Sequence, residues 1–296
     1  MKSKIENIFN FKKIFKYRKN KRSNTIRINL TRSNLAGAYF EERDFTEANL
    51  SGSDLTNANF KRASFIWTDL NGVILQNSNC DRSYFHFASL LWADLSRASL
   101  VEADFSCAKA SQADLTGTNC KLAKFMGTDL TGAYLTDGNF QAADFFNANL
   151  TGADCSNANL SQTNLAKAEF QQANLSNANL IEAQLINANM RGADLRGAVI
   201  RFAELELVDL ARANLTDCDF SHSSLFGANL EGAILNGAKL LNTDLRQANL
   251  ENTQLQNIDF TQCHITGAIF THARGLTTAQ KRWLRDRGAL NIERCL

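Results

Sequence analysis

Proline is absent from all 296 residues of the sequence, although average proteins contain about 5% of it. Because proline is a common residue of turns and loops, its absence argues against a chain that mixes helices, strands and irregular connections. Apolar runs are also short, and none approaches the roughly 18 residues that a transmembrane helix needs. Asn and Asp, in contrast, are abundant inside regular segments, which indicates one structure repeated along the chain.

Charge is unevenly distributed, although the formal net charge is only +2. Residues 1–24 contain nine Lys or Arg and one acidic residue, Glu6. Residues 25–270 contain 17 basic and 27 acidic residues, and residues 271–296 contain six and two. The body is therefore mildly acidic and both ends are basic. Residues 1–24 contain no apolar run longer than two residues, which argues against a secretory signal and favours a cytoplasmic location.

A five-residue repeat runs through most of the chain. Every multiple of five from Leu30 to Phe270 is apolar, and these 49 core positions hold 29 Leu, 13 Phe, three Cys, two Ile, one Met and one Ala. Two residues before them, 30 of the 49 are Ala and another 14 are Ser, Thr, Gly or Cys. Asn or Asp mostly stands between, so that the consensus is A(D/N)LXX. A period of five fits neither an α-helix nor a flat strand.

This pattern resembles the pentapeptide-repeat family over about 245 of the 296 residues. The resemblance implies an all-β solenoid, a right-handed quadrilateral β-helix with four pentapeptides per coil. It also implies that the core residue and the small residue two before it point inward. The repeats would then make about 12 coils, and neighbouring strands ~4.8 Å apart would give a rod roughly 58 Å long.

The distribution of phenylalanine tests the four-per-coil expectation independently. If a coil contains 20 residues, core positions 20 apart share a face. Six Phe then form one uninterrupted column, here called the Phe column: Phe45, Phe65, Phe85, Phe105, Phe125 and Phe145. Five others fall in an adjacent column: Phe40, Phe60, Phe140, Phe220 and Phe260. A 20-residue period explains this sorting, and stacked rings gain packing contacts beyond their burial.

The two ends are expected to differ from the repeats, which divides the chain into residues 1–24, 25–273 and 274–296. The sequence LTTAQKRWLRDRGAL predicts a short capping helix, with Thr277 or Thr278 as N-cap and Gly288 as the stop. Its apolar residues could cover the last coil: Leu276, Ala279, Trp283 and Leu284. The basic N-terminal segment carries an imperfect apolar stripe for a helix: Ile5, Ile8, Phe9, Phe11, Ile14 and Phe15. It either caps the first coil, lies on an anionic membrane or forms a loose tail.

Residues that could carry chemistry do not converge. Five cysteines occupy inward positions, where they replace small apolar residues: Cys80, Cys120, Cys155, Cys218 and Cys263. Cys107 is expected to point outward and Cys295 lies in the tail. No two of the four histidines share a column: His86, His222, His264 and His272. Arg43 is the one charged residue at an inward position, and it needs open early coils that allow pairing. With a filled interior and no nucleotide-binding or nucleophile motif, no enzyme, cofactor or metal site is expected.

The outer surface gives the strongest functional signal. Large apolar residues follow the core positions of one face, the face that contains the Phe column. The candidate partner-binding residues, here called the apolar face, are Ile66, Trp67, Phe87, Met126, Phe146, Ile186, Leu207 and Phe226. The equivalent outer column that begins Ala36, Thr56, Gln76 has no large apolar member. Such a concentration favours an interaction surface over scattered exposed side chains, and Leu91 and Trp92 extend it at the adjoining corner.

These observations favour a non-enzymatic binding or scaffold protein that acts through protein–protein contacts or self-association, with a regulatory role among the options. One alternative comes from the resemblance: some family members mimic duplex DNA and modulate DNA gyrase. The modest acidity of the body and the apolar face argue against it here. The other alternative is a peripheral membrane protein attached through residues 1–24. Direct nucleic-acid binding is disfavoured because the basic residues are confined to the ends, and no small-molecule substrate is expected.

Overall fold

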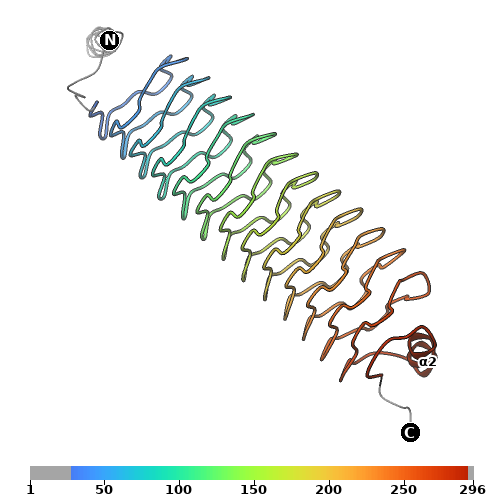
Figure 1. Cartoon of the computed structure of the whole chain (residues 1–296). Helices are drawn as coiled ribbons and strands as arrows, with labels where there is room; N and C mark the ends of the chain where they lie inside the picture. Colours follow the sequence, from blue (N-terminus) through green and yellow to red (C-terminus); the bar gives the residue numbers. More distant parts are fainter. Residues whose placement is uncertain (1–27, 293–296) are drawn as a thin grey trace.

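The computed structural model describes residues 28–292, which form a straight rod of stacked coils (Figure 1). Each coil meets the next through single parallel β-bridges between residues 20 positions apart, such as Asn119 with Asn139 and Asn139 with Asn159. The only α-helix among the described residues is α2, Thr278–Asp286. The 20-residue period predicted from the phenylalanine columns is therefore confirmed.

In a pentapeptide with Asn or Asp before the core residue, every backbone N–H can find an acceptor, as residues 139–143 illustrate. Three N–H groups bond to neighbouring coils, one closes the turn, and one reaches the side chain of Asn139. The distances are 2.8 Å from Asn139 N to Thr118 O, 2.8 Å from Phe140 N to Asn159 O, 2.9 Å from Ala142 N to Ser161 O, 2.9 Å from Ala143 N to Phe140 O and 3.2 Å from Gln141 N to Asn139 Oδ1. Asn and Asp before the core residue thus bond to the backbone of a tight turn.

This bonding scheme explains why the repeats contain no proline. A proline would remove one of the five donors. The second residue after each core position also has a positive φ from Arg32 to His272, with Gln262 the exception. Examples are Ala142 at 56° and Gly152 at 66°. A positive φ at the third residue of a turn is the mark of a type II turn, and the proline ring cannot adopt it.

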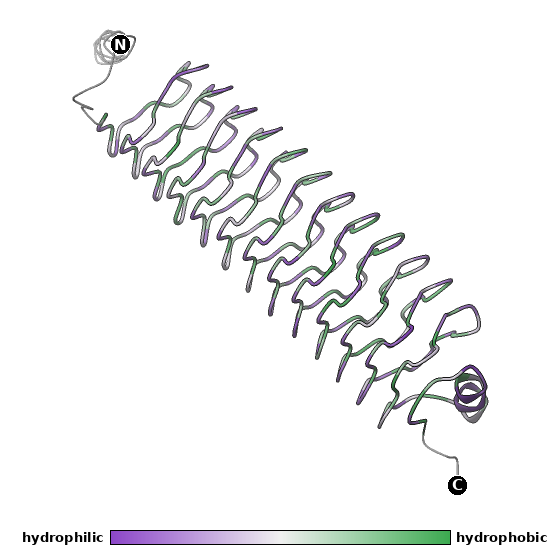
Figure 2. Ribbon diagram, in the orientation of Figure 1, coloured by the Kyte–Doolittle hydropathy of each residue, from purple (hydrophilic) through white to green (hydrophobic). Residues whose placement is uncertain are grey.

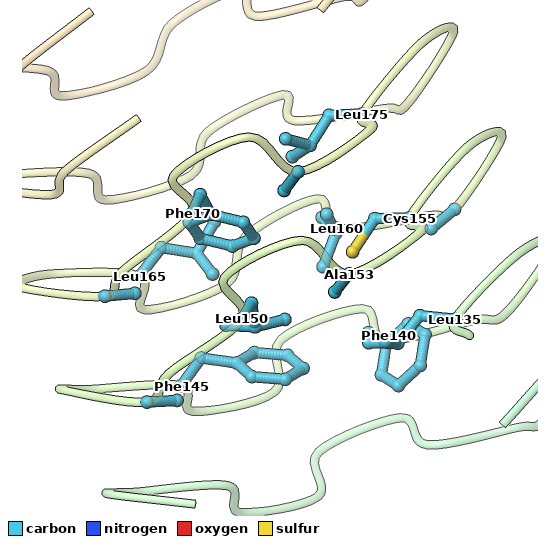
Figure 3. Packing of buried hydrophobic residues seen from close by; sticks show 14 of the residues in the cluster. Leu135, Phe140, Phe145, Leu150, Ala153, Cys155, Leu160, Leu165, Phe170 and Leu175 are labelled. Carbon is cyan, nitrogen blue, oxygen red and sulfur yellow. The ribbon is translucent and has the colours of Figure 1, made fainter. Parts of the chain in front are cut away.

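The interior is a continuous column of packed side chains. Core residues and the small residues two before them are buried along the rod, and Figure 3 shows Phe145, Leu150, Leu165 and Phe170 pointing inward. In the Phe column the successive ring centroids lie 5.3, 4.8, 4.4, 5.0 and 4.7 Å apart, with nearly parallel planes. Polar and apolar residues alternate along every coil (Figure 2). The five-residue repeat therefore places apolar residues in the core and mostly polar residues on the surface.

Helix α2 packs at the C-terminal end of the rod (Figure 1). Thr277 is its N-cap and forms a capping box with Gln280. The Gln280 side chain also donates to the carbonyl of Ile258 at 2.6 Å, near the site where the bridge pattern is interrupted. Leu284 is fully buried, and Leu276 and Trp283 pack partly buried against the core. After Gly288, at φ 83°, the chain adds one more bridge between Ile269 and Leu290.

The two rod ends depart from the repeat pattern. Arg43 occupies an inward position of the repeat frame, yet its side chain is exposed, which agrees with the expected open early coils. Ser33 and Ala38, at equivalent positions of the same first coil, are only half-buried. With no described coil before it, this coil leaves room for a charged side chain to reach water. Ala279, expected to help cover the last coil, is exposed on the outer side of α2.

Truncation of a ring in the Phe column should destabilise the rod strongly. Phe105→Ala removes a fully enclosed ring between two stacked neighbours, and we expect it to lower the free energy of unfolding by about 3–5 kcal/mol. Urea unfolding followed by circular dichroism measures this loss. The matched control is Phe87→Ala, because Phe87 is 45% exposed and its loss should cost about 1 kcal/mol or less. Equal effects of the two substitutions would contradict the assigned core.

Candidate functional site

The residues of the apolar face divide into two groups by exposure. Four are exposed: Trp67 by 59%, Phe87 by 45%, Met126 by 40% and Leu207 by 57%. The other four are half-buried: Ile66, Phe146, Ile186 and Phe226. All eight follow core positions of one column, so the 20-residue register brings them to one side of the rod. The apolar face thus consists of four exposed side chains and four half-buried ones along one side of the rod.

Three of the exposed residues occupy a disfavoured backbone conformation. Trp67, Phe87 and Leu207 have φ values of 56°, 55° and 57°. Equivalent turn positions elsewhere are often Gly or Asn, the residues that tolerate a positive φ best. Bulky side chains here are disfavoured both by the backbone and by their exposure to water. Trp92, Leu122 and Phe202 combine exposure with a positive φ at other corners, so the apolar face is distinguished by the alignment of its large apolar residues rather than by this conformation alone.

Trp67 and Phe87 form one preassembled aromatic surface. They stand 20 residues apart on consecutive coils, and their rings stack with centroids 4.4 Å apart and planes inclined by 8°. Stacking holds both rings in place before any partner arrives. A rigid aromatic pair of this kind is typical of binding hot spots.

Basic side chains lie over two of the half-buried rings. The Lys167 amine is 5.6 Å from the centre of the Phe146 ring, and the Arg246 guanidinium is 5.8 Å from that of Phe226. These cation–π contacts shield the rings from water. The uncovered apolar surface of the face is consequently concentrated on Trp67, Phe87, Met126 and Leu207.

Two polar side chains on this face bury an atom without a hydrogen-bond partner. Within residues 28–292 these are the Nδ1 of His86 and the Oε2 of Glu206. Both residues directly follow core positions that lie on the same side of the rod as the Phe column. The other ring nitrogen of His86 lies 3.3 Å from the Asp104 carboxylate, which Lys124 approaches to 3.9 Å. Buried polar atoms are rarely left unpaired, and in this conformation neither atom is accessible from outside the rod.

Sequence reasoning missed His86 and Glu206 as members of the site. Both follow core positions on this face, but the burial of one atom of each depends on how neighbouring side chains pack. Apolar exposure also occurs outside the apolar face, for example at Trp92 with 69% and Phe202 with 52%. Phe202 stacks on His222, its neighbour one coil later, at 4.9 Å. The 20-residue spacing of Phe202 and His222 could have predicted this stacking from the sequence.

Cysteine and metal chemistry have no support in the described residues. No group of three or more His, Cys, Asp or Glu within residues 28–292 could hold a metal ion. Burial raises the pKa of the Cys80, Cys120 and Cys263 thiols to about 12. Burial also raises the pKa of Cys155 and Cys218. Because only the thiolate reacts readily, these groups behave as small apolar residues.

A difference in thiol reactivity is therefore expected. In a Cys295→Ser background, iodoacetamide at pH 8 should alkylate the exposed Cys107 and spare the five buried cysteines until the rod unfolds. Their raised pKa values keep them protonated, and packing excludes the reagent. Mass spectrometry of native and urea-unfolded protein checks this. Rapid native labelling of Cys155 would contradict its burial in the core.

Coils joined by regular parallel bridges place this chain among the β-solenoid repeat proteins. The sequence profile described as Pentapeptide repeats matches in eight copies between residues 26 and 274. The chain therefore belongs to the pentapeptide-repeat family, as its sequence pattern predicted. A search of curated proteins returned no significant match.

Several solved structures resemble this chain. HetL, a pentapeptide repeat protein involved in heterocyst differentiation regulation from the cyanobacterium Nostoc sp. strain PCC 7120, is 27% identical, with a TM-score of 0.43; the match covers 86% of this chain and 93% of HetL. QnrB1, a plasmid-mediated fluoroquinolone resistance protein, is 18% identical, with a TM-score of 0.38, covering 58% of this chain and 90% of QnrB1. Rfr23 from the cyanobacterium Cyanothece 51142 is 27% identical, with a TM-score of 0.17, covering 42% and 89%.

Within the described part of the chain, no helix has the length and apolar character required to cross a bilayer.

Proposed function

We propose that this protein is a non-enzymatic, regulatory binding protein of the cytoplasm that docks a partner protein along the apolar face. The observation that carries the proposal is the alignment of eight large apolar residues along one side of the rod. Trp67, Phe87 and Leu207 are disfavoured there by both backbone and solvent. A partner that covers them would remove their exposure to water.

The proposal includes the arrangement expected from the sequence. The repeat domain, residues 25–273, would form about 12 right-handed quadrilateral coils, with residues 274–296 closing the C-terminal end. Hydrogen bonds between successive coils hold the outer side chains at fixed spacings. A partner that fits this spacing would lose little free energy to rearrangement of the rod.

The proposed partner needs one chemical property. It presents apolar side chains to the tips of Met126 and Leu207, which are 40% and 57% exposed. The half-buried Ile186 and Phe226 lie on the same face and would extend the contact.

Acidic substitutions on the face should abolish capture of the partner. We expect Met126→Asp/Phe146→Asp to lose a protein that the wild-type chain retains in a pull-down from lysate of the source organism, because two carboxylates would be desolvated at the interface. Circular dichroism first establishes that the variant is folded.

The matched control adds the same charge to the column without large apolar residues. Gln76→Asp/Ser96→Asp should capture the partner as wild type does. If both double variants, or neither, lost the partner, the apolar face would not be the docking surface.

A further inference from the structure

The N-terminal part of the apolar face carries an exposed aromatic pair. Trp67 is 59% exposed and Phe87 is 45% exposed, and their rings stack on each other across consecutive coils. His86, directly before Phe87, lies 3.3 Å from the Asp104 carboxylate. An occupant of this surface must bring apolar side chains.

The first 24 residues of the chain have this composition. They contain nine Lys or Arg and a single acidic residue, Glu6. The same segment carries six large apolar residues: Ile5, Ile8, Phe9, Phe11, Ile14 and Phe15. Its charge also complements the repeats, where residues 25–270 carry 27 acidic and 17 basic residues.

The chain enters the rod close to this surface. The described structure begins at Ile28 in the first coil, and Trp67 and Phe87 lie two and three coils further along. At ~4.8 Å per coil they are about 10 and 14 Å along the axis. A nine-residue connection from 19 to 27 spans up to about 30 Å. The first 18 residues can therefore reach the pair on their own rod.

We propose that residues 1–24 dock onto the N-terminal part of the apolar face of the same chain, over Ile66, Trp67, His86 and Phe87. Apolar residues of the segment cover the stacked rings, and its basic side chains face the acidic repeats. The segment thereby closes one part of the face and leaves Met126 to Phe226 open. This proposal uses the same face as the proposed function, but it requires no foreign partner and makes no contact with Met126 or Phe146.

Cross-linking to a native thiol tests the proposal in the full chain. Cys107 is exposed one coil beyond Phe87 at the same corner. In a Cys295→Ser background, Asn10→Cys adds a second thiol in the segment without changing its charge or apolar content. We expect a short bismaleimide to join residues 10 and 107 within one chain, which yields a monomer of altered mobility on a denaturing gel.

The matched control replaces the native thiol by one that lies half a coil away. Cys107→Ser/Arg97→Cys puts it at the opposite corner, where Arg97 is exposed and has the same backbone conformation, φ 58° against 58° for Cys107. The intramolecular adduct should be several-fold weaker there. Trp67→Asn/Phe87→Asn should also weaken the Cys107 adduct several-fold, since Asn accepts the positive φ and removes the apolar contact. Trp92→Asn, on the adjoining corner, should leave the yield unchanged.

Three results would overturn the proposal. A covalent dimer as the main product would assign the surface to the segment of a second copy. Equal yields at the two corners would show that the segment does not select this face. If the full chain then also co-sedimented with phosphatidylglycerol vesicles, the segment would be assigned to a membrane. Insensitivity of the Cys107 adduct to Trp67→Asn/Phe87→Asn would remove the aromatic pair from the contact. None of these results bears on partner capture through Met126 and Phe146.

Discussion

The 20-residue register of hydrogen bonds between coils determines the rest of this structure. Three of the five N–H groups in a typical pentapeptide bond to a neighbouring coil, and the other two close the turn. An inserted residue would shift every later bridge. A proline would remove a backbone donor from the same network. The same register places every fifth side chain inward, where Leu and Phe exclude water. Backbone bonding and the hydrophobic core thus impose the same period.

Much of this could be predicted from the sequence because the interactions recur. The five-residue period shows which side chains are inward, and the column from Phe45 to Phe145 distinguishes a 20-residue coil from other arrangements. The repeat does not predict exposure correctly in the terminal coils, which have a neighbouring coil on one side only. Arg43 and Ala279 lie near the two ends, and there exposure depends on what packs against the terminal coil.

The candidate site was only partly predictable for a related reason. The 20-residue spacing by itself places Trp67 beside Phe87, and the stacking of their rings follows from that register. The buried atoms of His86 and Glu206 could not be predicted, because they depend on side-chain conformations of residues 20 positions away. The positive φ of Trp67 and Leu207 was equally hidden, since turn positions of this kind also hold Arg, Glu and Gln.

A solenoid with a filled core has to place its specificity on the outside. Inward positions are restricted to residues that fit the stack, so they carry little information about a partner. Outer positions are free of that restriction, and on most of the surface they hold small or polar side chains. Where the chain instead keeps Trp67, Phe87 and Leu207 in a disfavoured conformation, with unpaired polar atoms beside them, neither core packing nor coil pairing explains the choice. The proposed docking of a partner would explain it, because a partner would remove these apolar side chains from water.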